Sequence, residues 1–217
     1  MSKEKKNYVQ NSVLGKVLRT IGFAAVLFSA MFYLAFYLGV LNLGGEFPGK
    51  IIDFYLNTIK LNFVWTSVIF YGGMLLLTWC LSKNYVLRIL TTVFIVVAVT
   101  FGSSGICYLA NAPEFLVDIR TKMFDMWGLF GTVVYLPANL LLAILLLKKK
   151  PISLPAIFIG IGMAISVVCI LLGVIDFYVD FADFAETFNK IGYYLALTTY
   201  GTASIGSLLG IIFCYKK

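Results

Sequence analysis

Residues 126–147 read MWGLFGTVVYLPANLLLAILLL, and residues 152–175 read ISLPAIFIGIGMAISVVCILLGVI. Neither run contains a charged side chain, and only the segment KKKP separates the two runs. A helix needs about 20 apolar residues to cross a bilayer, and in lipid it satisfies its own backbone hydrogen bonds. The two runs therefore predict a pair of transmembrane helices joined by a tight basic loop.

Four more charge-free apolar runs surround this hairpin. They cover about residues 20–43, 61–82, 89–110 and 191–215. Over the whole chain 61% of residues are hydrophobic and 12% are charged, whereas soluble domains have roughly 45–50% and about 25%. The sequence therefore predicts an all-α membrane bundle: one domain over residues 1–217, with six transmembrane helices in three hairpins.

The charges of the connecting segments predict the orientation. One set of alternate segments contains Glu4 as its single acid and twelve bases: Lys3, Lys5, Lys6, Lys16, Arg19, Lys83, Arg88, Lys148, Lys149, Lys150, Lys216 and Lys217. The other set contains nine acids and five bases: Lys50, Lys60, Arg120, Lys122 and Lys190. Because Lys and Arg favour the cytoplasmic side, we expect both termini in the cytoplasm, an uncleaved first span and a multi-pass protein of the cell membrane. The net charge of +7 is then a topology signal and does not indicate nucleic-acid binding.

Each of the three outer connections carries an amphipathic pattern typical of a short helix. The apolar faces are Ile52, Tyr55, Leu56 and Ile59; Leu116, Ile119 and Met123; and Phe181, Phe184, Ala185 and Phe188. Asp176, Asp180, Asp183 and Glu186 form an acidic face on the third. These helices either pack together as a lid over the bundle or lie separately in the headgroup layer as connectors.

The six runs contain no Asp, Glu, Lys or Arg, and the chain contains no histidine. Intramembrane ionisable groups usually mark proton relays and ion paths, so their absence argues against a pump or a proton-coupled transporter. The absence of histidine excludes histidine-dependent triads, zinc sites and haem ligation. Outer acids such as Glu114, Asp118 and Asp176 show no paired-carboxylate spacing. We therefore expect no enzyme activity, no metal and no cofactor.

Uncharged polar and aromatic residues in the spans predict a binding site. Tyr71, Tyr135 and Tyr200 stand at similar depths in the second, fourth and sixth helices. Asn139 lies one helical turn after Tyr135 and next to Pro137, which frees a backbone carbonyl. Asn139 either ties two helices together or contacts a ligand. With the three tyrosines it would form a neutral pocket for a small amphipathic or aromatic solute or a lipid tail.

Small residues at four-residue spacing predict close helix packing. Thr202, Gly206 and Gly210 have this spacing on the sixth helix, and Gly160 and Ala164 have it on the fifth. Small residues at this spacing let helix backbones approach closely in lipid. The two faces serve either packing within the bundle or docking of another membrane subunit.

Two functions fit these observations. The first is a small-solute- or lipid-binding transport subunit, and the alternative is a structural, regulatory or immunity-type protein that contacts a partner laterally. In outline the chain is similar to the substrate-binding subunits of energy-coupling-factor vitamin transporters, which are also short chains with six spans and both termini inside. That likeness concerns architecture and carries over no residue. The Ile-, Phe-, Tyr- and Lys-rich composition suggests a low-GC bacterium.

Overall fold

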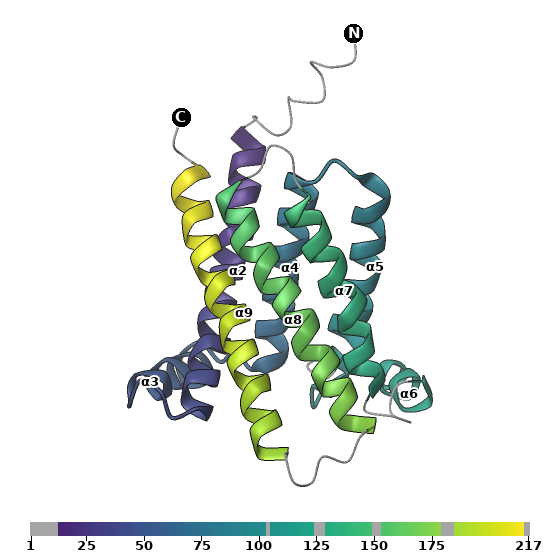
Figure 1. Cartoon of the computed structure of the whole chain (residues 1–217). Coiled ribbons are helices and arrows are strands. Elements are labelled where there is room, and N and C mark those ends of the chain that lie inside the picture. Colours follow the sequence, from purple (N-terminus) through teal and green to yellow (C-terminus); the bar gives the residue numbers. More distant parts are fainter. Residues whose placement is uncertain (1–12, 103–104, 124–128, 149–152, 179–184, 215–217) are drawn as a thin grey trace.

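The computed structural model describes residues 13–102, 105–123, 129–148, 153–178 and 185–214, which form an α-helical bundle without strands (Figure 1). The long helices are α2 (Val13–Val40), α4 (Phe63–Leu81), α5 (Tyr85–Phe101), α7 (Leu129–Leu147), α8 (Leu154–Tyr178) and α9 (Ala185–Cys214). The predicted all-α membrane bundle is thus confirmed. Each long helix corresponds to one of the apolar runs.

Five of the long helices are long and apolar enough to cross a membrane: α2, α4, α5 with the short turn after it, α8 and α9. The sixth, α7, lies in the same bundle and is equally apolar, but its described side chains cover only Thr132–Leu147. Residues 124–128, which precede α7, lie outside the described part of the chain. The structure therefore shows five candidate spans, and the sixth stays a prediction.

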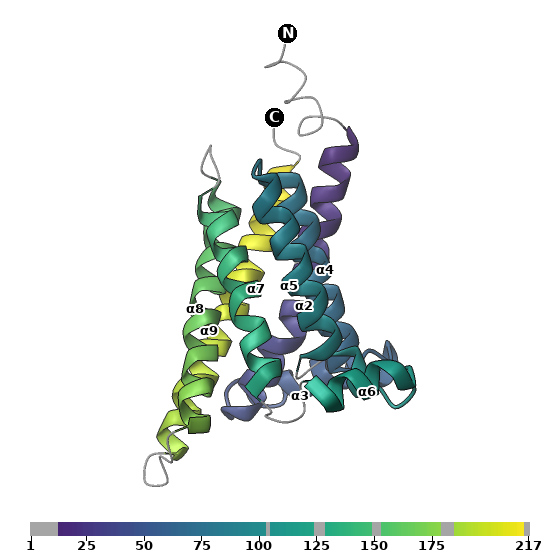
Figure 2. The same cartoon turned by 90° about the vertical axis from the view of Figure 1, so that its right-hand side faces the viewer.

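The helices form a ring that follows the order of the chain. Each long helix packs against the next one, and α9 closes the ring against α2. The start of α2 and the finish of α9 lie at one end of the bundle, here called the termini end (Figures 1 and 2). The short helices α3 (Phe47–Asp53) and α6 (Glu114–Met123) lie at the opposite end, here called the loop end. The ring encloses an interior to which side chains of several helices contribute.

The first, fifth and sixth helices each extend beyond one end of the span predicted from the sequence. The first helix begins at Val13 rather than residue 20, and Lys16 and Arg19 belong to it. The fifth continues past residue 175 to Tyr178, and the sixth begins at Ala185 rather than residue 191. Charged side chains mark the edge of the apolar run, but a helix can continue beyond the hydrocarbon because its backbone bonds do not depend on lipid.

The third span was predicted as one helix over 89–110, and this was wrong. Helix α5 begins at Tyr85, after Asn84 caps it by accepting a hydrogen bond from the Leu87 N–H at 3.1 Å. It ends at Phe101, and Gly102 is extended, with ψ of 173°. A methyl group on Gly102 would lie 2.4 Å from the Tyr135 ring, so this position needs glycine. A 3-10 turn, η3 (Ile106–Tyr108), follows.

Two of the three predicted outer helices are present. The first consists of α3 and a π-helical turn, η2 (Phe54–Thr58), and the second is α6. The predicted third helix is not separate, because Phe188 and Glu186 belong to the first turns of α9. Phe181, Phe184, Asp180 and Asp183 lie outside the described residues. Glycine is absent from residues 185–191, so nothing in the local sequence separates this amphipathic turn from the apolar helix that follows.

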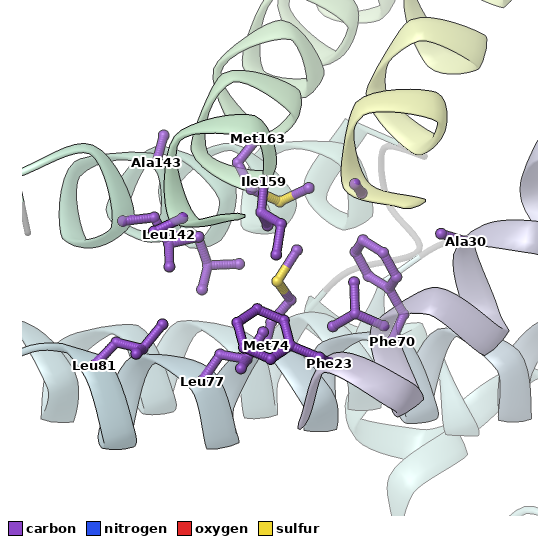
Figure 3. Close-up of a cluster of buried hydrophobic side chains, with 14 of the residues drawn as sticks. Phe23, Ala30, Phe70, Met74, Leu77, Leu81, Leu142, Ala143, Ile159 and Met163 are labelled. Carbon is purple, nitrogen blue, oxygen red and sulfur yellow. The ribbon is translucent and has the colours of Figure 1, made fainter. Parts of the chain in front are cut away.

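The termini half of the ring is filled with apolar side chains. Met74 and Leu77 from α4 meet Leu142 from α7 and Ile159 and Met163 from α8, and each of the five is at most 1% exposed (Figure 3). Helix α2 approaches α4 closely there, since a methyl group on Gly73 would lie 2.9 Å from the carbonyl oxygen of Gly22. This dense packing closes the interior of the ring toward the termini end.

Candidate ligand-binding cavity

A cavity of about 220 Å³ lies on the loop-end side of the apolar core, between α2, α4, α7, α8 and α9. Its polar lining combines five tyrosines with hydroxyl and amide side chains: Tyr33, Tyr37, Ser67, Tyr71, Tyr135, Asn139, Ser166, Thr199 and Tyr200. Cys169, Ile170 and Ala196 complete the described lining, in which no residue carries a charge. The structure thus brings the predicted residues Tyr71, Tyr135, Asn139 and Tyr200 into one site.

The tyrosine rings form two stacked groups. Tyr200 stacks on Tyr33 with a centroid distance of 4.6 Å and on Tyr37 at 5.9 Å. Tyr71 stacks on Tyr135 at 5.7 Å. All five tyrosines line the same cavity. Ring–ring contacts therefore hold the walls while the hydroxyls concentrate polarity in a small volume.

An outer helix supports the α2 wall of the cavity. The Tyr33 hydroxyl donates a hydrogen bond to the Phe63 carbonyl at 3.1 Å, across the α2–α4 contact. Tyr55 from η2 is buried and donates to the Phe28 carbonyl of α2 at 2.5 Å. Its ring also lies 5.2 Å from that of Phe32. The turn containing Tyr55 thus fixes the segment of α2 that carries Tyr33.

Asn139 both ties helices together and lines the cavity. Its amide nitrogen donates to the Tyr135 carbonyl at 2.8 Å, and the same nitrogen lies 3.2 Å from the Tyr71 hydroxyl oxygen. The side chain is 1% exposed. The two interpretations of Asn139 are therefore compatible. The Asn139 carbonyl oxygen accepts a hydrogen bond from the Tyr71 hydroxyl at 3.4 Å, and its second lone pair can accept from a further donor.

Thr199 contributes an unused hydroxyl to the cavity wall. The side chain is 3% exposed, and its Oγ1 has no hydrogen-bond partner among the described residues. The neighbouring Thr198 and Thr202 behave differently, because each hydroxyl bonds back to a carbonyl of its own helix at 2.8–3.0 Å. A buried hydroxyl without a partner costs about 1–3 kcal/mol, so a ligand or a water that bonds to Thr199 would recover that energy.

A second cavity connects the site with the loop end. It measures about 180 Å³, lies between α8 and α9, and shares Tyr37, Cys169 and Ala196 with the first cavity. Asp176 lies in its wall. Helices α8 and α9 diverge toward the loop end (Figure 1), and the second cavity lies between them. Tyr37 and Tyr193, whose rings are 6.2 Å apart, both line this second cavity.

The small-residue faces lie inside the bundle. A methyl group on Gly206 would lie 2.8 Å from the Pro155 carbonyl oxygen of α8, and one on Gly210 would lie 2.5 Å from the Phe23 ring of α2. Gly160 meets Leu147 of α7 in the same way, Ala164 packs on the apolar core, and Thr202 lies against Gly162. Each of the five residues thus contacts another helix of its own chain.

The sequence analysis missed several lining residues, chiefly Tyr33 and Tyr37 of α2, Ser166 and Cys169 of α8, and Thr199. A signal existed for the first pair, because Tyr33 and Tyr37 are four residues apart and share one helix face. Placing that face in the site requires the contact between α2 and α9, which joins opposite ends of the chain. Local spacing cannot predict such a contact.

The chemistry of the site is that of neutral hydrogen bonding and aromatic contact. Within the described residues, no three His, Cys, Asp or Glu side chains gather as metal ligands would. Comparisons of the chain with protein-family models, with curated proteins and with solved structures find no match. The geometry of the cavity therefore carries the functional argument.

Proposed function

We propose that this chain is a membrane-embedded binding subunit for a small uncharged solute with hydrogen-bonding groups. The observation that carries the proposal is the cavity lined by five tyrosines, Asn139 and Thr199, whose hydroxyl has no hydrogen-bond partner among the described residues. Pockets for drug-sized ligands measure roughly 300–1,000 Å³, so a cavity of about 220 Å³ suits a smaller molecule.

The polar lining of the cavity also favours a small solute over a lipid tail as the ligand. A lipid tail gains nothing from hydroxyls and an amide, and burying these groups against it without hydrogen bonds would be unfavourable. A charged solute would find no described counter-charge in the cavity wall. A neutral molecule with a flat or compact ring and one or two polar groups satisfies both constraints.

The position of the cavity supports binding rather than a continuous pore. Access is available from the loop end between α8 and α9, while the apolar core closes the termini end. With the predicted orientation, the solute would enter from outside the cell. A transport step would then need a rearrangement of the core, with or without a further subunit in the membrane.

The alternative function, lateral contact with a partner, draws less support from the packing. It depended on the small-residue faces of α8 and α9, and those residues contact helices of the same chain. A partner would have to use the exposed apolar side chains on the surface of the bundle, such as Val86, Val93 and Val96 of α5.

Native mass spectrometry tests the proposal. The full chain is purified in mild detergent from the membranes of the cells that produce it. We expect wild-type protein to carry a small molecule, Thr199→Val to carry less of it, and Asn139→Leu to carry none. Thr198→Val is the matched control, because its hydroxyl bonds to its own helix at Tyr194. Thr198→Val should bind the solute as wild type does. A wild-type protein that carries only phospholipid, to the same extent as all three variants, would refute the proposal.

A further inference from the structure

A third cavity, of about 290 Å³, lies at the termini end of the bundle. The α4–α5 turn and the last turn of α7 enclose it. Its polar wall contains Lys83, Lys148, Ser82 and Asn84, and its apolar wall includes Leu87 and Ile144. Two lysines and two neutral polar residues thus share the wall of this cavity with apolar side chains, near the ends of α4 and α7.

Within the part of the chain that the structure describes, no acidic side chain pairs with the charges around this cavity. The described acids all belong to segments of the loop end: Glu46, Asp53, Glu114, Asp118, Asp176 and Glu186. Three bases there form ion pairs one helical turn away, Lys50 with Glu46 at 3.2 Å, Lys122 with Asp118 at 3.9 Å and Lys190 with Glu186 at 2.6 Å. No described carboxylate lies close enough to pair with Lys83 or Lys148. An anion in this cavity would thus meet uncompensated positive charge.

The turn that carries Lys83 is fixed by its own hydrogen bonds. The Asn84 side chain caps α5 through the Leu87 N–H at 3.1 Å, and the Asn84 N–H donates to Ser82 Oγ at 3.2 Å. Since Ser82 Oγ accepts that bond, its own proton remains able to donate to an anion. The nearby Arg88 has a different role, because it donates to the Trp79 carbonyl at 3.1 Å and covers the Trp79 ring.

We propose that this cavity binds the phosphate headgroup of an anionic phospholipid. Lys83 and Lys148 supply the charge, the Ser82 hydroxyl donates a hydrogen bond, and the glycerol and first acyl carbons contact Leu87 and Ile144. Basic pockets between transmembrane helices suit such headgroups. The apolar wall distinguishes a phospholipid from free phosphate, which would leave Leu87 and Ile144 against water. The proposal is independent of the solute cavity at the other end.

The test titrates the detergent-purified full chain with phosphatidylglycerol or phosphatidylcholine and counts bound lipids by native mass spectrometry. Wild type should bind one phosphatidylglycerol tightly and phosphatidylcholine weakly. In the Lys83→Gln/Lys148→Gln variant, the affinity for phosphatidylglycerol should fall by about tenfold or more, since each lysine near an anionic headgroup contributes substantially. The control Lys50→Gln/Lys122→Gln, which removes two charges from the loop end, should bind like wild type.

A Lys83→Arg/Lys148→Arg variant distinguishes the loss of charge from misfolding. It keeps both charges and should retain selective binding of phosphatidylglycerol. Equal affinity for the two lipids in wild type, or an equal loss in the control, would overturn the proposal. A competition arm with millimolar inorganic phosphate separates the two sources of phosphate. If inorganic phosphate alone displaces the lipid, the cavity is a simple anion site and the assignment to a phospholipid is wrong.

Discussion

The termini half and the loop half of the ring are built from the same helices but serve different purposes. Helix α4 carries Met74 and Leu77 in the filled core and Ser67 and Tyr71 in the cavity wall. Helix α9 likewise places Gly206 in a tight contact with α8 and Thr199 beside empty space. The centre of the termini half is thus packed mainly with apolar side chains, while the loop half leaves room and polar groups for a ligand.

This contrast indicates a division between stability and binding. In lipid, helices associate through close packing and hydrogen bonds rather than through a hydrophobic driving force. The termini half provides that packing with small residues and interlocking side chains, so the loop half can remain hollow. Substitutions in the two halves should therefore affect different measurements, and the following predictions test that difference.

The largest effect is expected for Gly206→Leu. An added side chain would meet the Pro155 carbonyl at 2.8 Å from its first carbon, and backbone cannot move aside as a flexible side chain can. We expect a loss of stability at the upper end of the roughly 1–3 kcal/mol that overpacking costs, seen as a lower unfolding temperature in detergent. Gly72→Leu is the control, since nothing lies within 4 Å of that position. Equal destabilisation by both variants would contradict the tight α8–α9 contact.

Leu77→Ala should destabilise the filled half by a smaller amount. Leu77 is fully buried in the core, and its truncation leaves a void whose lining loses dispersion contacts. We expect about 2 kcal/mol, the low end of the range for Leu→Ala in cores, because the transfer of apolar surface from water plays no part in lipid. Val93→Ala, at a position 54% exposed toward the surface of α5, should change the unfolding temperature little. Retained binding of the solute in Leu77→Ala would support the separation of the two halves.

Tyr55→Phe should reduce stability the least, by loosening the contact between η2 and the segment of α2 that lines the cavity. It removes the hydrogen bond to the Phe28 carbonyl, worth about 1 kcal/mol. Burial also raises the pKa of Tyr55 from 10.0 to about 12. The folded state therefore favours the neutral phenol. The contribution of the Tyr55 hydroxyl to folding stability is complete below pH 10 and is lost as the pH rises from about 10 to about 12.

Unfolding temperatures of wild type and Tyr55→Phe, measured between pH 9 and pH 12, would check this prediction. The difference between wild type and Tyr55→Phe should shrink toward the alkaline end of the series. A difference that stays constant over the whole range would contradict the shifted titration of the Tyr55 hydroxyl, and the absence of any difference would show that Tyr55 acts through its ring alone.

Much of the bundle could be predicted because lipid imposes strong local constraints. The apolar runs marked the helices, and the residues Asn84 and Gly102 set limits that a closer inspection of caps and breakers could have found. The error in the third span came from treating the segment after Phe101 as continuous apolar helix. The Tyr135 ring of another helix also lies against Gly102, where a methyl group would be 2.4 Å from it, and this close approach could not be predicted from the local sequence.

The candidate site was predictable in part for a related reason. Tyr71, Tyr135 and Tyr200 lie on helices running in one direction and stand at similar distances from the starts of their apolar runs, so the sequence predicted a similar depth for all three. Tyr33 and Tyr37 lie on α2, which runs the opposite way, and their depth could not be compared by the same count. Thr199 was unremarkable as one of two adjacent threonines until burial distinguished it from Thr198.

The sequence by itself determined which segments are apolar helices, how charge divides among the connecting segments, and that the apolar runs contain no Asp, Glu, Lys, Arg or His. These properties follow from the energy of placing each side chain in lipid or water, which depends on local composition. Only the tertiary structure decided that α9 closes against α2, that the small residues face inward, and that five tyrosines surround one cavity. Those outcomes depend on the shapes of side chains distant in sequence, because close packing is a property of contacting surfaces and not of any one segment.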